Sequence, residues 1–483
     1  MEEKVRGFLR DVEEAAERIR DWIREGSQIT IFTHNDADAL SSCGILAGAL
    51  RREEARFRCR SLHRIEEFYS LASEGYLNSD RLVFTDMGGG YVGELAERLK
   101  NFEVVILDHH EPSRTPLPEG WVHVNPHLHG IDGATEVSAS GVVYFTAKAL
   151  NPANTDYAAV AVVGALGDLQ DKNSVRRLHG LNELIVRDGV ENGLLETYDD
   201  FVLYGRTFRP LHVALASTTS PFIPGLSGRE DACYNFITSL GINVKEGDQW
   251  RTLSDLSEEE KKKLFSGLVE YLVARKMPAE MANELIGTAY DLKGEEGWIY
   301  LRDGREYATL LNSCGKTGRP YLGIAVAMGE RGEILEEASQ VLEEYRASLA
   351  KTMEYVSRPG VLETLNHTVV LKGGGVIDER QVSSVATILS SSGMIPRDRP
   401  LIALAEAGEY VKISARASRE LVSRGLNLGS ILSRLSVQHG GRGGGHNIAA
   451  GAEIPSDRLL RFLADFDRCV GEVLSDGGGV DNS

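Results

Sequence analysis

Acidic residues and histidines follow short apolar runs in the first third of the chain. Asp108, His109 and His110 come directly after Val104–Leu107, a run typical of a buried parallel strand. Three further apolar segments end in the same way, and these supply His34, Asp36 and Asp38 after Ile29–Thr33, Asp86 after Leu82–Thr85, and Asp168 after Ala158–Leu166. Ligands bind at the carboxyl ends of the strands in open α/β sheets. We therefore expect these side chains to gather at one edge of a sheet.

Carboxylates that are crowded together repel one another and are costly to desolvate, and a multivalent cation relieves both problems. Aspartate and histidine without cysteine suit Mn²⁺ or Mg²⁺, with Zn²⁺ as a further option. The set of candidate aspartate and histidine ligands is too large for one ion and suits two. Two ions about 3.5–4 Å apart could stabilise the attacking and leaving oxygens of a phosphoryl displacement.

The composition limits the class of protein. A chain of 483 residues predicts two or three domains. It contains no apolar run long enough to span a membrane, and its N-terminus lacks the apolar core of a secretory signal. Five scattered cysteines without a C-x-x-C pair favour reduced thiols in a cytoplasm.

The formal net charge is −18, which is the wrong sign for a nonspecific nucleic-acid coat. A nucleic-acid substrate would have to be held locally, by arginines and metals on an acidic body. The acidity could instead serve solubility or attract a basic partner.

Strand and helix patterns alternate over residues 1–205, which predicts an α/β domain with a parallel sheet. An amphipathic helix over residues 4–24 precedes the first strand. Residues 206–295 contain prolines and then helical patterns, and we interpret them as an inserted helical module. Residues 296–475 are predicted to form a smaller α/β domain, and residues 476–483 a disordered tail. Within 296–327 the apolar runs predict strands at Trp298–Leu301, Tyr307–Leu311 and Tyr321–Ala327.

Four segments, His34-x-Asp36-x-Asp38, Asp86, Asp108-His109-His110 and Asp168, resemble the motifs of the DHH phosphoesterase superfamily. Further along, Gly443-Gly444-Gly445-His446 resembles the glycine-rich signature of the companion DHHA1 domain. The chain most resembles the archaeal RecJ-like branch, which includes the GINS-associated nucleases and is related to a eukaryotic replicative-helicase subunit. The resemblance covers nearly the whole chain except the middle segment. Ala39 departs from the family pattern, since many members carry glycine there, but this change removes no ligand.

The resemblance implies a role for each matching residue. His34 and Asp36 would hold one metal, Asp38, His109 and Asp168 the other, and Asp86 both, with a shared water as nucleophile. Asp108 would orient its neighbours, and His110 would contact the scissile phosphate. The residues expected to bind the strand are Arg416, Arg442, Gly443, Gly444, Gly445 and His446, since arginine and exposed backbone amides suit phosphates. Two further histidines, His127 and His129, are interpreted as loop residues near the site.

The implied function is a manganese-dependent phosphodiesterase that removes nucleotides from the 5′ end of single-stranded DNA or RNA in replication or repair. The DHH domain would cut, and the DHHA1 domain would hold the strand across a cleft. A GINS-like replication complex is a possible partner of the middle segment, and no membrane is expected. Two alternatives stay open. One is hydrolysis of short oligoribonucleotides or cyclic dinucleotides, and the other is a replisome scaffold that kept the fold and lost catalysis.

Overall fold

The computed structural model describes residues 2–77, 79–173, 175–218, 221, 223–277, 279–295, 297–356, 358–391 and 395–476. The chain divides into two compact units. The first unit comprises residues 1–210, 250–259 and 279–343, and the second comprises residues 211–249, 260–278 and 344–483. The predicted disordered tail, residues 476–483, lies outside the described residues except for Asp476.

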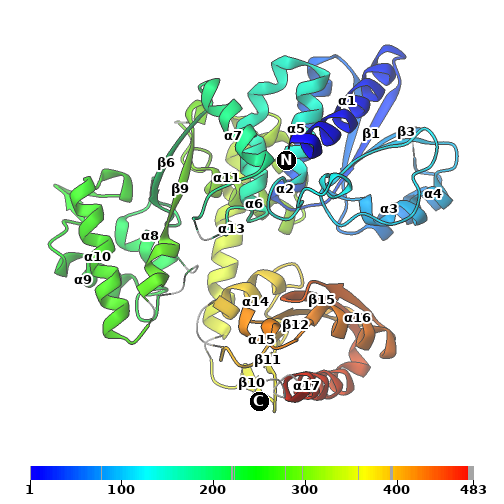
Figure 1. The fold of residues 1–483 in the computed structure, drawn as a ribbon. Helices are drawn as coiled ribbons and strands as arrows, with labels where there is room; N and C mark the ends of the chain where they lie inside the picture. The colour runs from blue at the N-terminus through cyan, green and yellow to red at the C-terminus, as the bar shows by residue number, and fades with distance from the viewer. Residues whose placement is uncertain are drawn as a thin grey trace. The chain divides into compact units, whose positions relative to one another are not determined.

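The N-terminal part of the first unit contains a five-stranded parallel sheet, whose strands β1 and β3 are labelled in Figure 1. Its strand order is β2-β1-β3-β4-β5, and every neighbouring pair is parallel. The strands are β1 (Gln28–Thr33), β2 (Arg56–Ser61), β3 (Arg81–Thr85), β4 (Glu103–Leu107) and β5 (Val122–Val124). The predicted α/β class with a parallel sheet is thereby confirmed.

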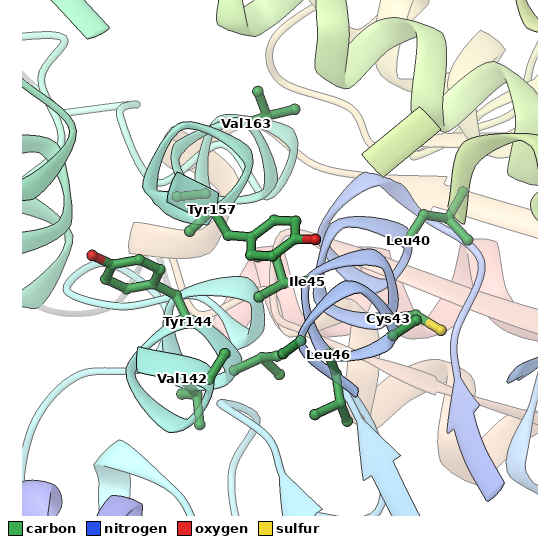
Figure 2. Packing of buried hydrophobic residues seen from close by; sticks show 14 of the residues in the cluster. Leu40, Cys43, Ile45, Leu46, Val142, Tyr144, Tyr157 and Val163 are labelled. Carbon is green, nitrogen blue, oxygen red and sulfur yellow. The ribbon is translucent and has the colours of Figure 1, made fainter. Parts of the chain in front are cut away.

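Helices pack on both sides of this sheet. They include α1 (Glu2–Arg24), α2 (Ala37–Arg52), α3 (Ile65–Ser73), α4 (Val92–Arg98) and α5 (Ala139–Leu150). Two further helices, α6 (Ala158–Gly167) and α7 (Leu181–Glu191), pack on α5, and α6 also packs on α2. The central helix is α2, which is buried along nearly its whole length. Figure 2 shows Leu40, Cys43, Ile45 and Leu46 of α2 with residues of α5 and α6. This packing fixes the start of α2, where two of the candidate ligands lie.

Residues 298–327 form no strands, so three predicted strands are wrong. Residues 298–301 form a turn, and α11 (Gly304–Lys316) and α12 (Pro320–Ala327) follow it. The sequence carried the helical signal, because apolar side chains in Tyr307–Cys314 recur at helical spacing. Asp303 also accepts hydrogen bonds from the backbone N–H groups of Arg305 and Glu306, as an N-cap residue does. Both helices contribute to the core of the first unit, whereas the sequence placed them in the last domain.

An antiparallel pair of strands flanks the middle segment. Strand β6 (Leu195–Phe201) pairs with β9 (Ile286–Leu292). Between them lie α8 (Leu211–Ser217), α9 (Glu230–Ser239), the short strands β7 (Lys245–Glu246) and β8 (Gln249–Trp250), and α10 (Glu258–Ala274). The described part of the segment is thus mainly helical, but β9 lies inside the predicted boundary of 206–295.

A second, mixed sheet forms within residues 344–476, with strand order β10-β11-β12-β13-β15-β14. Its strands are β10 (Leu362–Thr364), β11 (Val369–Leu371), β12 (Leu401–Ala407), β13 (Tyr410–Arg416), β14 (Arg442–Gly445) and β15 (Ala449–Pro455). The associated helices are α14 (Val382–Ser391), α15 (Arg419–Ser423), α16 (Leu428–Gln438) and α17 (Leu459–Asp476). The long helix α13 (Glu333–Val356) runs from the first unit into the second. Across all described residues, no helix combines the length and apolar composition needed to cross a bilayer.

Candidate metal centre

The parallel register brings the candidate ligands to one edge of the first sheet. Thr33 is opposite Thr85, and Thr85 is opposite Leu107, so three strands end at the same level. His34 follows β1, Asp86 follows β3, and Asp108 begins the loop after β4. Asp168 arrives from a helix instead, as the residue that ends α6. Four segments thus deliver polar side chains to one place, as the sequence predicted.

Three groups of side chains have ligand atoms that all lie within 4.8 Å of one another. One contains His34, Asp36 and Asp86, and another contains Asp38, His109 and Asp168. The third, Asp86 with His109 and His110, connects the other two. The described residues therefore offer two adjoining pockets of carboxylate and imidazole ligands, a donor set that suits Mn²⁺ or Mg²⁺.

Asp86 lies where the two pockets meet. Its backbone has φ of 58°, a conformation that is uncommon outside glycine and that is concentrated at functional sites. Its side chain is buried, and Oδ1 makes no hydrogen bond of good geometry to the described residues, although Nε2 of His109 lies 3.3 Å away. Burial, together with the charge of Asp36, raises the pKa of this carboxyl well above its ordinary value. A cation would satisfy this oxygen and would stabilise the ionised form.

The ring of His109 is held by its own Nδ1, which lies 2.8 Å from the backbone carbonyl oxygen of Gly133. Because a carbonyl can only accept, Nδ1 carries a proton. Burial would lower the pKa of His109, but the interactions with the surrounding aspartates raise it, so the metal-free ring is positively charged. A metal would displace the proton on Nε2 and take that nitrogen as its ligand. Nε2 lies 3.3 Å from Oδ1 of Asp86 and 3.9 Å from Oδ2 of Asp38. The hydrogen bond thus directs Nε2 to the junction of the two pockets.

Gln170 connects the same carbonyl to Asp168. Its Nε2 donates to the Gly133 oxygen at 2.8 Å and to Oδ2 of Asp168 at 2.9 Å. The amide oxygen of Gln170 in turn accepts from Asn182 at 2.6 Å. Burial raises the pKa of Asp168 to about 7, although the positive charge of His109 opposes this shift. Gln170 therefore orients a carboxylate that would be only partly ionised at neutral pH without a cation.

Asp38 reaches the second pocket from a helix. It lies in the first turn of α2, and its exposed fraction is 3%. Its two carboxylate oxygens accept hydrogen bonds from the backbone N–H groups of Ala139 and Ser140, at 2.8 and 3.0 Å. Those N–H groups are at the start of α5, where the helix dipole favours a negative charge. Asp36 and Asp38 belong to different ligand groups. This follows from their places in the chain, because Asp36 is the N-cap residue of α2 and Asp38 lies within its first turn.

His34 and Asp36 contact each other in the first pocket. Nδ1 of His34 lies 3.1 Å from Oδ2 of Asp36, and Nε2 lies 3.1 Å from the carbonyl oxygen of His63. Burial would lower the pKa of His34, but the hydrogen bond and the charge of Asp36 outweigh it and raise this pKa to about 9. The other carboxylate oxygen of Asp36 accepts from the N–H of Ala39 as the N-cap of α2.

Asp108 and His110 form a pair beside the pockets. Asp108 is 1% exposed, and its Oδ2 accepts from the N–H of Gly89 at 2.8 Å. Its Oδ1 accepts from the N–H of His109 and lies 2.8 Å from Nδ1 of His110. This hydrogen bond raises the pKa of His110 to about 9. The side chain of His110 is 56% exposed, so an oriented and positively charged ring faces the solvent.

Residues far along the sequence hold the loop that carries His34 and Asp36. The side-chain oxygen of Asn312, in α11, accepts from the N–H of Ala37 at 3.0 Å. A side chain at Gly315, one turn later, would collide with the carbonyl of Asn35. Both residues lie between the strands that were predicted at Tyr307–Leu311 and Tyr321–Ala327, and no role was expected for them. The amphipathic pattern of 304–316 could have revealed the helix, but its contact with residues 35–37 depends on the tertiary structure.

His127 and His129 are not members of the ligand groups found among the described residues. His129 interacts with Asp11 of α1 through Nε2 and Oδ2, which are 2.5 Å apart. Nδ1 of His127 lies 3.8 Å from Glu111. Both histidines lie in the short 3₁₀ helix Pro126–His129 rather than in an irregular loop.

The residues predicted to bind the nucleic-acid strand lie in the second unit. The glycine-rich segment is not a free loop, because Arg442 to Gly445 form the edge strand β14. Arg442 forms an ion pair with Glu453 at 2.6 Å. Glycine at 443 and 445 is explained by close packing against α16 and β15, whereas a side chain at Gly444 would meet open space. Arg416 and Gly445 lie at the same end of the sheet, opposite Ala449 and Ala450.

Arg416 has no carboxylate partner among the described residues. Its guanidinium instead donates to the hydroxyl groups of Thr387 and Ser414 at 3.1 and 3.0 Å. It also donates to the backbone carbonyls of Ser383 and Ala415. These neutral acceptors leave the positive charge of the side chain uncompensated. His446, directly after β14, is exposed.

Three known domain families match successive parts of the chain. Residues 28–165 match the DHH family N-terminal domain, residues 203–286 the DHH-CID domain, and residues 366–472 the DHHA1 domain. A protein of Methanocaldococcus jannaschii, MJ0831, whose function is uncharacterised, is 31% identical over 471 residues. That match covers 96% of this chain and 99% of the archaeal protein. The chain belongs to the DHH family.

This DHH-family chain is also similar to RecJ proteins. It is 32% identical over 194 residues to the single-stranded-DNA-specific exonuclease RecJ of Thermus thermophilus. The match covers 38% of this chain and 28% of that RecJ. The similarity is therefore to a part of a longer nuclease.

Two solved structures share the fold over nearly the whole chain. CDC45 from Entamoeba histolytica has a TM-score of 0.64 and 14% identity, and the match covers 95% of this chain and 99% of that chain. An exonuclease RecJ bound to manganese has a TM-score of 0.53 and 19% identity, covering 95% and 94%. At these identities the comparisons establish the fold and leave the activity open.

Proposed function

We propose that this protein is a metal-dependent phosphodiesterase that removes nucleotides from the end of single-stranded DNA or RNA. The observation that carries the proposal is the presence of two adjoining ligand groups, one with Asp86 and one with His109, that a third group containing both residues connects. A protein that served only as a scaffold would gain nothing from buried, mutually repelling carboxylates, because their burial costs stability. The sequence similarity to a RecJ exonuclease and the manganese in a RecJ structure support this choice of chemistry and of metal.

In this proposal, His34 and Asp36 would hold one divalent ion and Asp38, His109 and Asp168 the other, with Asp86 serving both. Two such ions would supply Lewis-acid stabilisation of the phosphoryl oxygens and would favour ionisation of an attacking water.

The chain's own residues prepare the site. Asp108 fixes the partly exposed ring of His110 through Nδ1, which would leave Nε2 to contact the scissile phosphate. The Gly133 carbonyl and Gln170 fix His109 and Asp168. Preorganised groups of this kind need no rearrangement during the reaction.

The second domain would bind the strand. Arg416 carries a charge that its neutral partners do not offset, and a guanidinium suits a phosphate. Backbone N–H groups of the edge strand β14 and the exposed His446 would add further contacts. Arg442 would have to leave Glu453, or bind phosphate together with it.

The test is digestion of end-labelled single-stranded DNA and RNA by the full chain, in Mn²⁺, in Mg²⁺ and in EDTA. We expect mononucleotides to be released from one end in Mn²⁺, with duplex resistant and no product in EDTA. Labels at the two ends determine the direction, which the RecJ resemblance predicts to be 5′ to 3′. A strong preference for di- to pentanucleotides or for cyclic dinucleotides would replace the exonuclease by the short-substrate alternative. Absence of hydrolysis on every substrate, in a protein shown to bind Mn²⁺, would contradict the proposal.

A second candidate function is a replication scaffold that binds a GINS-like complex. The match to a DHH-CID domain at residues 203–286 and the fold similarity to CDC45 favour it. The two functions can coexist in one chain, because the helices of the middle segment contribute no ligand to the groups found among the described residues. Co-purification of a GINS-like complex with the full chain, but not with a chain lacking the middle segment, would support a docking role for that segment.

A further inference from the structure

The edge strand β2 carries a row of arginines on one face. Arg56, Arg58 and Arg60 are exposed, while the residues between them are half-buried. Phe57 and Cys59 pack against the hydrophobic core of the first unit. The alternation follows from strand geometry, because successive side chains point to opposite faces. As β2 ends the strand order, we refer to Arg56, Arg58 and Arg60 as the β2 arginine row.

None of these three arginines has a carboxylate partner among the described residues, although the protein is strongly acidic, with a formal net charge of −18. Arginines nearby are paired. Arg51 contacts Glu330, Arg52 contacts Asp156, and Arg81, in the strand β3, contacts Glu25, Asp80 and Glu103. An unpaired row on such a protein is a local positive surface, which attracts polyanions.

The row leads towards the candidate metal centre. Strand β2 runs parallel to β1, and Arg60 is opposite Phe32, two residues before His34. At the end of β2 the Ser61 hydroxyl donates to the carbonyl of His34 at 3.0 Å. The carbonyl oxygen of His63 then lies 3.1 Å from Nε2 of His34. Hydrogen bonds thus connect the end of the strand that carries the arginines to His34, a candidate metal ligand.

We propose that the β2 arginine row binds the sugar–phosphate backbone of a single-stranded nucleic acid whose end is held at the metal centre. This inference rests on the proposed exonuclease function and specifies a path for the part of the substrate that is not being cut. Alternate residues of a strand are about 6.6 Å apart. That spacing is close to two steps of the roughly 3.4 Å rise per nucleotide of a stacked strand. Three guanidiniums could therefore contact every second phosphate of a stacked strand, or successive phosphates of a fully stretched one.

The choice of arginine at all three positions favours polyanion binding over protection of the sheet edge. Charged side chains on an edge strand can also prevent edge-to-edge association, and lysine is the residue most often used for that purpose. All three positions here are arginine, whose planar fork of donors binds phosphate in a bidentate manner. Protection of the edge is the alternative that the experiment must separate.

The test compares two triple variants of the full chain. The first, Arg56→Gln/Arg58→Gln/Arg60→Gln, removes the row. The matched control, Arg6→Gln/Arg10→Gln/Arg24→Gln, removes three exposed arginines of α1, which packs beside β5 at the other edge of the sheet. Both change the net charge equally. Thermal unfolding with and without Mn²⁺ checks that each variant folds and retains the metal centre.

Binding of fluorescent oligo-dT and oligo-U is measured by anisotropy in EDTA over a range of NaCl concentrations. Loss of three phosphate contacts should reduce the slope of log affinity against log salt by about 2, since each contact contributes about 0.7 on a single strand. At low salt the affinity should fall by about tenfold or more. The control should keep the wild-type slope. In Mn²⁺ the first variant should lose more activity on a long strand than on a dinucleotide, which is too short to reach the row.

The outcomes separate the inference from the proposed function. If the wild-type chain neither binds nor cuts any single strand, the proposed function fails and this inference fails with it. If the wild type binds and cuts single strands and both triple variants match it, the proposed function stands and the β2 arginine row does not bind the nucleic acid, so this inference is wrong. If the row is needed for sedimentation with phosphatidylserine vesicles but not for oligonucleotide binding, the polyanion is a membrane surface and the inference is likewise wrong.

Discussion

At the scale of single residues, Asp86 combines two costs that a stable fold would avoid. Its positive φ is unfavourable by about 1–3 kcal/mol for a residue with a side chain. Its buried Oδ1 makes no hydrogen bond of good geometry to the described residues, and its carboxyl is difficult to ionise because it is buried beside Asp36. Both costs are understandable if the side chain serves two cations.

Replacing Asp86 by asparagine should abolish the shared ligand while keeping the size of the side chain. We expect the rate of phosphodiester hydrolysis in Mn²⁺ to fall by about 10³-fold or more, and the stabilisation by Mn²⁺ in thermal unfolding to shrink. Asp80→Asn is a suitable control, since Asp80 is an exposed carboxylate at the opposite end of the same strand. An Asp86→Asn enzyme with a tenth of the wild-type rate would be inconsistent with a bridging role.

The raised pKa of Asp168 predicts a pH dependence of metal binding. Burial raises this pKa to about 7 from its ordinary value of 3.8, so the metal-free folded protein keeps the carboxyl protonated below about pH 7. The unfolded chain loses this proton near pH 3.8, whereas the folded chain holds it up to about pH 7. The stabilisation that the protonated Asp168 gives to the folded state is therefore complete below pH 3.8 and is lost as the pH rises to about 7. A bound cation needs the ionised form. The gain in melting temperature on adding Mn²⁺ should therefore increase as the pH rises through about 7.

Gln170→Leu provides a matched variant for this measurement. The hydrogen bond from Gln170 favours the ionised form of Asp168, so its loss should move the midpoint of the Mn²⁺ effect to higher pH. A midpoint that is the same in both proteins would show that another group controls the pH dependence.

At the scale of elements, α11 supports both sides of the metal centre. Near its start, Arg305 forms an ion pair with Asp171 at 2.5 Å, three residues after Asp168. Towards its end, Asn312 accepts from Ala37, one residue after Asp36. One rigid helix thus fixes the spacing between the loop after β1 and the end of α6.

Replacing Asn312 by leucine should leave the N–H of Ala37 without its acceptor and loosen the loop that carries Asp36. An unsatisfied buried donor costs about 1–3 kcal/mol, and we expect Mn²⁺ affinity and hydrolysis to fall by about tenfold while the fold is retained. Asn312→Asp keeps an acceptor oxygen and should recover most of the Mn²⁺ affinity. The control is Thr309→Val, which removes a hydrogen bond to Arg305 within α11 itself. Equal effects of the leucine and valine variants on Mn²⁺ affinity would point to general weakening of the helix.

At the scale of the whole molecule, a buried ion-pair cluster lies within the first unit, between residues that precede and residues that follow the helices of the middle segment. Arg206 is 1% exposed. Its guanidinium contacts Asp291, lies 2.6 Å from Asp303, and lies 3.6 Å from Asp200. Asp303 is also the N-cap residue of α11. Removing Arg206 would leave these carboxylates buried without compensation, at a cost of about 3–5 kcal/mol.

A deletion of the middle segment should therefore begin after Arg206 and end before β9. We expect a chain that lacks residues 211–278, closed by a short Gly-Ser linker, to fold and to hydrolyse single strands in Mn²⁺. Binding of a GINS-like complex should be lost, which pull-down with the full and the shortened chain would reveal. Retained partner binding would locate the docking surface elsewhere. As a control, the same deletion with Arg206→Met should unfold at a lower denaturant concentration.

The sequence alone determined the parallel sheet and the chemistry at its edge. Each acid or histidine stands directly after an apolar run, and the alternation of strand and helix leaves parallel strands as the simple solution. In a parallel sheet, the residues that follow the carboxyl ends of neighbouring strands lie at the same edge of the sheet. For this reason His34, Asp86 and His109, which are far apart along the chain, could be predicted to share one site.

Only the tertiary structure decided which groups hold these ligands in place. The N–H groups that anchor Asp38 come from α5, and the acceptor for Ala37 comes from Asn312, 275 residues away. Such contacts depend on how helices pack, and local patterns carry no information about them. The same holds for the β2 arginine row, because the exposure of alternating arginines depends on β2 being the edge strand. Short apolar runs such as 321–327 were also undecided locally, since seven residues fit a buried strand or a buried helix, and packing into the first core selected the helix.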